Sequence, residues 1–409
     1  MADVSRSGAG TGRRATEAVA EPETDRRPVP LVWAALVLWA LGWAWARRTP
    51  SGISWHYFTD GVHWLFATDG IHLYAHHPQL QVGPLTLVAV APATLLPAAA
   101  ALAVVQVVGT AVGLLALWAA TLASPRPVPW WVLLVAGAVM LPAWTVLSVR
   151  WVHPDDVLAV GLAVCAMAAV RYKNGVLAGL LLGAAVAAKP WAIGFEPVLL
   201  MLPRDRALRG LAAGAVVVTA AWAPFLLGDP STLSALHPPV AIADTSVLHL
   251  FGVGGTQVPA WTRPVQLLSA PVVAYLVVRR GRWLAVPLVA FAVRLAIDPQ
   301  DIGYYEGAAV AFAVLADLRR DGGRWVGVPW WTLGTAAAMW HPFVTDFARR
   351  DQLAGPIDLL WFDHPTGVAW VHLAWAVVVV LGHVVPPAVR GRRVRPGSGR
   401  NRVRVRPTG

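Results

Sequence analysis

Long hydrophobic runs separated by short polar turns fill the chain from about residue 30 to residue 388. A helix that crosses a bilayer needs about 20 apolar residues, and roughly ten to twelve segments approach that length. The pattern therefore predicts an all-α polytopic membrane protein with about 10–12 transmembrane helices in a single domain over residues 29–388. The clearest runs are one near the start of the chain, at about 30–46, and six in its second half, at about 210–227, 264–279, 283–297, 304–317, 327–343 and 367–388.

Two of the hydrophobic runs contain a proline that predicts a break in the helix. The run over 175–203 has Lys189 and Pro190 at its centre, and the run over 129–147 contains Pro142. Proline lacks the backbone N–H that a helix needs, so we expect two half-helices in each run. A charged side chain at membrane depth is costly unless it faces a cavity or a partner. Lys189 is therefore a candidate functional residue, with snorkelling to the interface as the alternative.

Composition and charge agree with a membrane protein. Hydrophobic residues make up 57% of the chain and charged residues 13%, and the 22 Trp are of the type that anchors helices at lipid headgroups. The formal net charge of +11 lies largely in tails and short loops, which favours contact with membrane lipids and not with nucleic acid. Frequent Ala, Arg, Gly and Pro with scarce Lys are typical of a GC-rich bacterial genome. We therefore expect a multi-pass protein of the bacterial cytoplasmic membrane.

Arginine clusters predict which segments face the cytoplasm. They lie at 204–209, 279–282 and 318–324 and in the Arg-rich tail 389–409, and all four are expected on the cytoplasmic side. Residues 1–28 have no hydrophobic periodicity, so they are expected to form a disordered cytoplasmic tail.

A polar and aromatic insertion at 47–82, which the same orientation places outside the cell, carries the first candidate chemistry. Apolar residues recur with helical spacing over 55–66, which predicts a short amphipathic external helix suited to a membrane surface. On such a helix, Asp60 shares one side with His56, His63 and Trp64. We interpret Asp60 as a candidate general base, with an ordinary solvated loop as the alternative.

Asp69 is the competing carboxylate of this insertion, but its place before Gly70 suits a turn better than a catalytic face. His72, His76 and His77 have the spacing of metal ligands on a helix, yet carboxylate partners are few and imidazoles alone do not define a site. The single Cys165 allows no disulfide within the chain. We therefore expect no metal site and no cofactor.

Short motifs follow the first hydrophobic run in the order Asp60, Val62-His63, Gly70, Leu73-Tyr74 and Gly83-Pro84, and a Leu-rich run from Gly179 ends in Lys189-Pro190. This order resembles the polyprenol-phosphate-dependent glycosyltransferases of the C superfamily, specifically family 87, the bacterial mannosyltransferase group. That family has Val-Tyr, Tyr-Pro-Pro and a Gly-Gln-x-Asn turn where this chain has Val62-His63, Val82-Gly83-Pro84 and Val152-His153-Pro154-Asp155. The resemblance covers residues 30 to 230.

The resemblance implies an inverting glycosyltransferase. It would move a sugar, mannose in that family, from a polyprenyl-phosphate donor to a glycolipid or polysaccharide acceptor, with its active site facing outside. Asp60 would be the general base. The residues that would bind the donor phosphate or the substrate are Lys189, Arg150, His153, His63, His56, Tyr74, Trp64 and Tyr304. Tyr304 lies beyond the resemblance, in the acidic segment 298–306, which is expected to lie outside. As a functional segment it would close over the acceptor, and the alternative is an ordinary polar loop.

Two other classes of protein remain possible on the sequence. A transporter or flippase of a lipid or lipid-linked sugar would carry ionisable residues at the midplane of two related halves, but no inverted repeat is visible. A structural membrane subunit without chemistry would explain the departures from the family motifs. The large polar insertion outside the membrane favours an enzyme.

Overall fold

The protein is helical throughout the part of the chain that the structure describes. This computed structural model describes residues 29–236, 239–300, 303–318, 328–339 and 364–385, and none of these ranges contains a strand. Five helices are long and apolar enough to cross a membrane: α1 (Val29–Ala46), α5 (Ala98–Ala123), α6 (Trp130–Thr145) with the π-helical η2 (Val146–Trp151), α9 (Arg204–Gly228) and α17 (Pro365–Val384). The all-α polytopic membrane fold predicted from the sequence is thus confirmed.

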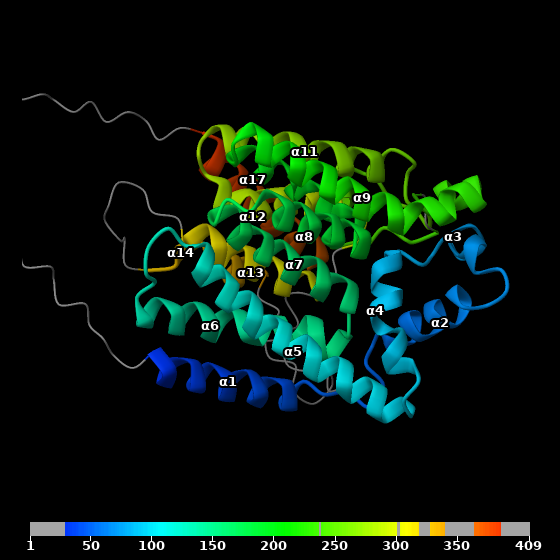
Figure 1. Ribbon diagram of the computed structural model, residues 1–409, viewed down its shortest axis with the longest axis horizontal. Helices are drawn as coiled ribbons and strands as arrows, with labels where there is room; N and C mark the ends of the chain where they lie inside the picture. The colour runs from blue at the N-terminus through cyan, green and yellow to red at the C-terminus, as the bar shows by residue number, and fades with distance from the viewer. Residues whose placement is uncertain (1–28, 237–238, 301–302, 319–327, 340–363, 386–409) are drawn as a thin grey trace, which may run out of the picture.

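The remaining helices pack between and beside these five (Figure 1). They are α2 (Trp55–Leu65), η1 (Gly70–His72), α3 (Leu73–His76), α4 (Pro84–Thr94), α7 (Pro154–Arg171), α8 (Gly175–Ala188), η3 (Pro190–Met201), η4 (Pro230–Leu236), α10 (Val247–Leu250), α11 (Thr262–Arg279), η5 (Trp283–Ala285), α12 (Val286–Leu295), α13 (Tyr305–Asp317) and α14 (Trp330–Met339). Each of the seven clearest hydrophobic runs therefore contains a helix. In the run at 327–343 this helix is α14.

The predicted helix break at Pro142 is wrong. Helix α6 passes through this proline and continues as η2 to Trp151, so a single 22-residue helical segment crosses the bundle. Pro142 cannot donate to the carbonyl of Ala138, but the indole Nε1 of Trp39 on α1 donates to that oxygen at 3.0 Å. A side chain of a neighbouring helix thus satisfies the carbonyl that proline leaves unpaired, which is how membrane helices tolerate proline.

The predicted break at Lys189 is confirmed. Helix α8 ends at Ala188, Lys189 has an extended backbone with φ −150° and ψ 112°, and the 3₁₀-helical η3 starts at Pro190. The chain then returns beside its own starting point, because Gly175 on α8 contacts Arg206 on α9 and the Arg206 guanidinium donates to the carbonyl of Lys173 at 3.0 Å. Lys189 therefore lies at the tip of a hairpin formed by α8 and η3.

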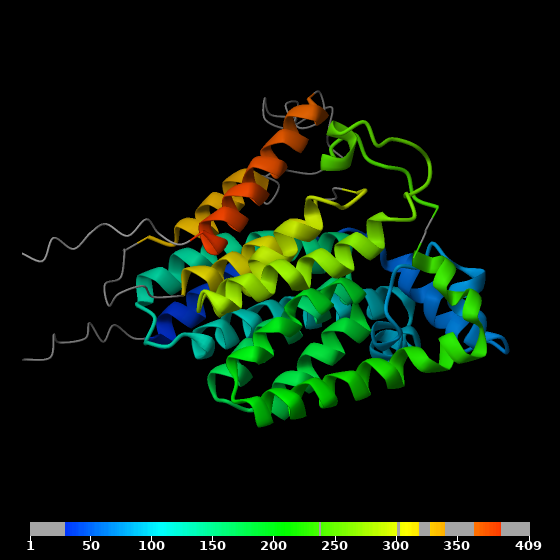
Figure 2. The ribbon, with the colours of Figure 1, turned by 90° about the horizontal axis from the view of Figure 1, so that it is seen from above.

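The segment after α1 forms a separate small core at one end of the bundle, where Figure 1 places α2, α3 and α4. Its buried side chains include Trp55, Phe58 and Val62 of α2, with Leu73 and Tyr74 of α3. The amphipathic helix predicted over this stretch is confirmed, but its expected place on a membrane surface is wrong. Trp55, Phe58 and Val62 pack in a protein core because α3 and α4 cover this face of the helix. Figure 2 shows this end of the molecule beside the far end of α9.

A hydrogen bond ties that segment to α9. His72 Nδ1 lies 2.9 Å from Asp229 Oδ2, directly after the last residue of α9. Hydrogen bonds from Ser231 and His72 lower the pKa of Asp229 to about 2, so its carboxylate is charged at neutral pH. The tails 1–28 and 389–409, and most of the Arg cluster at 318–324, lie outside the described residues.

Candidate functional site

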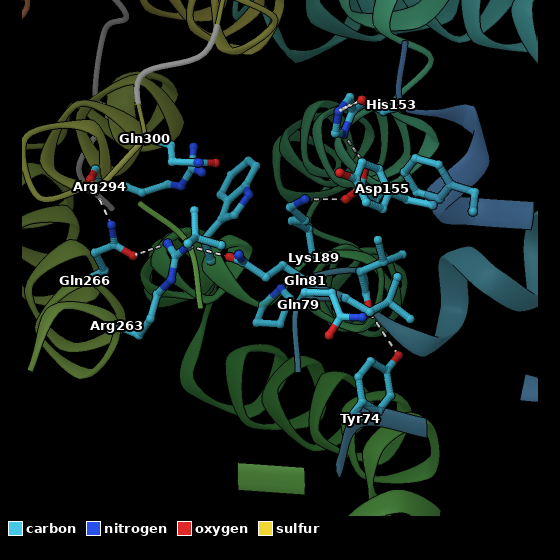
Figure 3. A pocket seen from close by; sticks show the side chains of 18 of the residues that line it. Tyr74, Gln79, Gln81, His153, Asp155, Lys189, Arg263, Gln266, Arg294 and Gln300 are labelled. Atoms are coloured by element: carbon cyan, nitrogen blue, oxygen red, sulfur yellow. Dashed lines mark hydrogen bonds and ion pairs between the residues drawn. The ribbon is translucent and has the colours of Figure 1, made fainter. Parts of the chain in front are cut away.

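A large cavity opens between the segment 47–82, which follows α1, and the helix bundle. Its volume is about 780 Å³. Its wall is formed by α2, α3, the start of α7, the tip of the α8–η3 hairpin, the end of α9, η4, α11, the end of α12 and the start of α13. The wall is mainly apolar and aromatic, with a few charged side chains. Figure 3 shows these charged residues as two groups, one around Asp155 and Lys189 and the other around Arg263 and Arg294. A large apolar pocket with few converging polar groups is typical of a substrate site.

The first group pairs two buried carboxylates with one lysine. The Lys189 ammonium donates to Asp155 Oδ2 and lies 3.4 Å from Asp156 Oδ2. Asp155 is 0% exposed, Asp156 1% and Lys189 8%. Charges at this depth are stable only when they are paired, so the three side chains depend on one another. Asp155 and Lys189 line the cavity, while Asp156 lies behind them.

Local backbone signals place these three residues. Val152 adopts a left-handed conformation with φ 55°, which ends η2, and Pro154 then starts α7. Asp155 and Asp156 therefore occupy the first turn of α7, where the helix dipole favours negative charge. Helix α8 ends at Ala188 and η3 starts at Pro190, so Lys189 lies between the two helices and belongs to neither. The start of α7, which follows Pro154, and the end of α8, which precedes Pro190, thus meet at one ion pair.

His153 connects the carboxylates to the cavity wall. Its Nδ1 lies 3.3 Å from Asp155 Oδ1, and its Nε2 lies 2.8 Å from the Ser54 hydroxyl at the start of α2. The Tyr304 ring stacks on the imidazole with centroids 3.8 Å apart. A carboxylate can only accept, so the tautomer that donates from Nδ1 to Asp155 leaves Nε2 as a proton acceptor that faces Ser54. This is the relationship of a general base and its orienting carboxylate.

The second group places two arginines around one carboxylate. Arg294 Nη2 lies 2.9 Å from Asp298 Oδ2, and Arg263 Nη1 lies 3.6 Å from the same oxygen. Arg263 also donates to Gln266 Oε1 at 2.8 Å and to the side chain of Gln81. The carboxylate of Asp298 is buried, so this part of the predicted external acidic segment belongs to the protein interior.

The first group also contains atoms that are able to hold a metal ion. His153, Asp155 and Asp156 each offer a ligand atom, and these atoms lie within 4.8 Å of one another. The Lys189 ammonium already neutralises charge at the same carboxylates, and a divalent cation there would be repelled by it. The geometry therefore favours the ion pair.

Four of the residues predicted from the sequence line this cavity: Lys189, His153, Tyr74 and Tyr304. Five others do not: Asp60, His56, His63, Trp64 and Arg150. Asp60, His56 and His63 are exposed on α2, and Trp64 stacks on His77 with centroids 3.7 Å apart. Arg150 is buried in η2, and its carbonyl accepts from the backbone N–H of Ile53.

The residues that sequence reasoning missed are Ser54, Asp155, Asp156, Arg263 and Arg294. A signal for two of them was present, because adjacent carboxylates after His153-Pro154 at the start of an apolar helix are costly without a cation. Lys189 was the only lysine recognised at membrane depth, so the two features pointed to each other. No local signal marks Ser54 or the two arginines as neighbours.

Comparison with known proteins adds no further assignment. No family model, no curated protein and no solved structure matches this chain.

Proposed function

We propose that the protein is a membrane glycosyltransferase that moves a sugar from a polyprenyl-phosphate donor to a hydroxyl of a glycolipid or polysaccharide acceptor. The observation that carries the proposal is the group of His153, Asp155 and Lys189 on the wall of a large cavity. Group transfer to a hydroxyl needs a positioned proton acceptor beside a space for both substrates. The resemblance of the sequence supplies the donor class, with mannose as the expected sugar.

In the proposed reaction the acceptor hydroxyl attacks the anomeric carbon of the donor. The bond from that carbon to the phosphate oxygen breaks, and its electron pair leaves with the phosphate. The hydroxyl proton passes to His153 Nε2, while Asp155 accepts from Nδ1 and stabilises the imidazolium that forms. Attack opposite the leaving group inverts the anomeric carbon.

Lys189 has a different part in this proposal from the phosphate contact expected from the sequence. Its ammonium is engaged by Asp155 and Asp156, so it holds these carboxylates in place beside His153. The aromatic wall supplies flat apolar surfaces for a sugar or an isoprenoid, mainly from Trp151, Trp191 and Trp222.

Transport is the second candidate, and one observation favours it. A buried lysine paired with aspartates inside a membrane bundle is also typical of ion and proton pathways. The two functions differ in what they produce, since a transporter changes the location of its substrate and a transferase changes its covalent structure.

The test is to incubate purified protein with labelled polyprenyl-phosphate mannose and extracted envelope lipids. We expect labelled product, and His153→Gln and Asp155→Asn should each reduce the rate by about 10²–10⁴, the usual contribution of general-base catalysis. Asp69→Asn is the matched control, because Asp69 is an exposed aspartate of the segment 47–82. Flux into sealed vesicles without a new product would support transport, and neither activity would support a structural subunit.

Asp60→Asn separates the two candidate bases in the same assay. If the proton goes to His153, Asp60→Asn keeps most of the activity, because Asp60 is exposed and does not line the cavity. An inactive Asp60→Asn protein together with an active His153→Gln protein would identify Asp60 on α2 as the general base, as predicted from the sequence.

A further inference from the structure

We infer that the cavity contains an anion-binding site for a phosphate group at Arg263 and Arg294, separate from the group of His153, Asp155 and Lys189. The inference rests on the proposed function only for what carries the phosphate. Figure 3 shows Arg263, Gln266 and Arg294 together, apart from Lys189 and Asp155. Both arginines line the same cavity as His153, so an anion bound to them would share that space with the proton acceptor.

Charge balance is the first argument. Arg263 and Arg294 share the single carboxylate of Asp298, at 3.6 Å and 2.9 Å. Two guanidinium groups meet one carboxylate here, and Arg294 is only 3% exposed. The carboxylate of Asp156 also acts on Arg294 through space, but Asp156 is already engaged by Lys189. A phosphate would add charge-assisted hydrogen bonds to an arginine pair whose nearest carboxylate is shared.

Unused hydrogen-bond donors are the second argument. Nε and Nη1 of Arg294 are buried and have no acceptor in the described part of the chain. Its guanidinium lies over the rings of Tyr305, at 4.2 Å, and Trp191, at 5.0 Å. Such packing holds the plane of the guanidinium and leaves its N–H edges for a ligand. Buried donors without acceptors are rare in proteins, and a bound ligand is a common reason for them.

The arrangement suits a phosphate group in particular. Arginine forms two parallel hydrogen bonds with adjacent oxygens, and a phosphate offers enough oxygens for two arginines at once. Gln266 and Gln81 hold Arg263 in position from two sides. Lys189 is already engaged by carboxylates, so it is a poor alternative for the phosphate. The same chemistry is shared by a polyisoprenyl phosphate headgroup and by free phosphate.

The test measures binding without acceptor and without turnover. The probes are a polyisoprenyl monophosphate in lipid nanodiscs, the corresponding polyisoprenol, and inorganic phosphate. Arg263→Gln removes one positive charge, and Arg294→Lys keeps the charge but removes the bidentate guanidinium. Each variant should weaken binding of the phosphate probe by roughly tenfold to a hundredfold. Arg279→Gln is the matched control, because Arg279 lies on the same helix α11 and is exposed.

Asp298→Asn is a second variant with the opposite expectation. It removes the negative charge that competes for both arginines, so the folded variant should bind the phosphate probe more tightly than the wild type. A variant that merely damaged the fold would not gain affinity.

Each outcome bears on the inference. Stronger binding of the polyisoprenyl phosphate than of the polyisoprenol, lost in Arg263→Gln, supports a lipid headgroup at the site. If inorganic phosphate binds as tightly as the polyisoprenyl phosphate, and its binding is also lost in Arg263→Gln, the ligand of the site is free phosphate. Wild-type binding by both arginine variants, or equal binding of polyisoprenol and its phosphate, overturns the inference. Phosphate binding without any sugar transfer would refute the proposed function alone, and transfer with arginine-independent binding would refute the inference alone.

Discussion

Lys189 is the residue on which the buried charge of the site depends. It is the cation that contacts both Asp155 and Asp156, and all three residues are less than a tenth exposed. A buried ion pair adds little stability over an apolar pair, but removing one partner leaves an uncompensated charge. The structural role of Lys189 therefore has to be measured together with any catalytic one.

Lys189→Met should lower the free energy of unfolding by about 3–5 kcal/mol, because two buried carboxylates lose their cation. Denaturant unfolding of the purified protein in detergent measures the change. The double variant Lys189→Met/Asp155→Asn should recover part of the loss, since one of the two stranded charges is gone. Arg209→Met, at an exposed ion pair on α9, is the control and should change little. Wild-type stability of Lys189→Met would mean that the carboxylates are neutral without it.

Ser54 offers a finer test of how His153 is held. Its hydroxyl lies 2.8 Å from His153 Nε2 and is buried at the start of α2. Ser54→Ala removes one neutral hydrogen bond, worth about 0.5–1.5 kcal/mol. We expect the turnover number to fall by up to about tenfold, far less than in His153→Gln. A Ser54→Ala protein as inactive as His153→Gln in the transfer assay would give the serine itself a chemical role.

At the scale of elements, the position of Lys189 depends on close packing of α8 against α9. Three glycines of α8 face α9 at equal intervals: Gly175, Gly179 and Gly183 lie against Arg206, Gly210 and Gly214. The constant offset shows that the two helices run in parallel. Small residues at helix contacts let membrane helices approach closely. This approach fixes the hairpin that carries Lys189 into the cavity.

Gly179→Ala should therefore destabilise the protein. A Cβ atom at Gly179 would lie 1.9 Å from the carbonyl oxygen of Gly210, so the helices must separate. Overpacking of this kind typically costs about 1–3 kcal/mol, which thermal unfolding in detergent resolves. Gly42→Ala on the exposed side of α1 is the matched control, because nothing lies within 4 Å of its added methyl group. Equal melting temperatures for the two variants would contradict the close contact.

The sequence predicted elements better than it predicted the site. Periodicity identified α2, and Pro190 identified the break at Lys189, because both effects act within a few residues. Pro142 gave a wrong break because the Ala138 carbonyl that it leaves unpaired accepts from Trp39, 99 positions away in the chain. The site fails to appear in the sequence for the same reason: Lys189 meets Asp155 across 34 positions and His153 meets Ser54 across 99. Asp60 was chosen from local spacing alone.

At the scale of the whole molecule, α9 connects two distinct ends. Its first turn lies beside Gly175 and Lys173, and its last residue, Gly228, packs against Ile71 of the segment 47–82. Its 25 residues extend about 37 Å, enough to cross a bilayer core of about 30 Å. The α8–η3 hairpin enters from the first end and returns to it, so the turn before α8 and the turn before α9 lie on the same side.

Single-cysteine labelling tests this arrangement in a Cys165→Ala background, with a membrane-impermeant maleimide. Tyr172→Cys and Asp205→Cys stand in the two turns at the first end of α9, and Asp69→Cys stands at the other end; all three positions are exposed. The arginines around Asp205 predict that the first end faces the cytoplasm. In intact cells we expect only Asp69→Cys to react, and after permeabilisation all three. Labelling of Tyr172→Cys and Asp205→Cys from opposite sides would refute the hairpin, because α8 and η3 would then form one continuous crossing. Labelling of both from outside, with Asp69→Cys protected, would keep the hairpin and reverse only the orientation, which would move the cavity and its phosphate site to the cytoplasmic side.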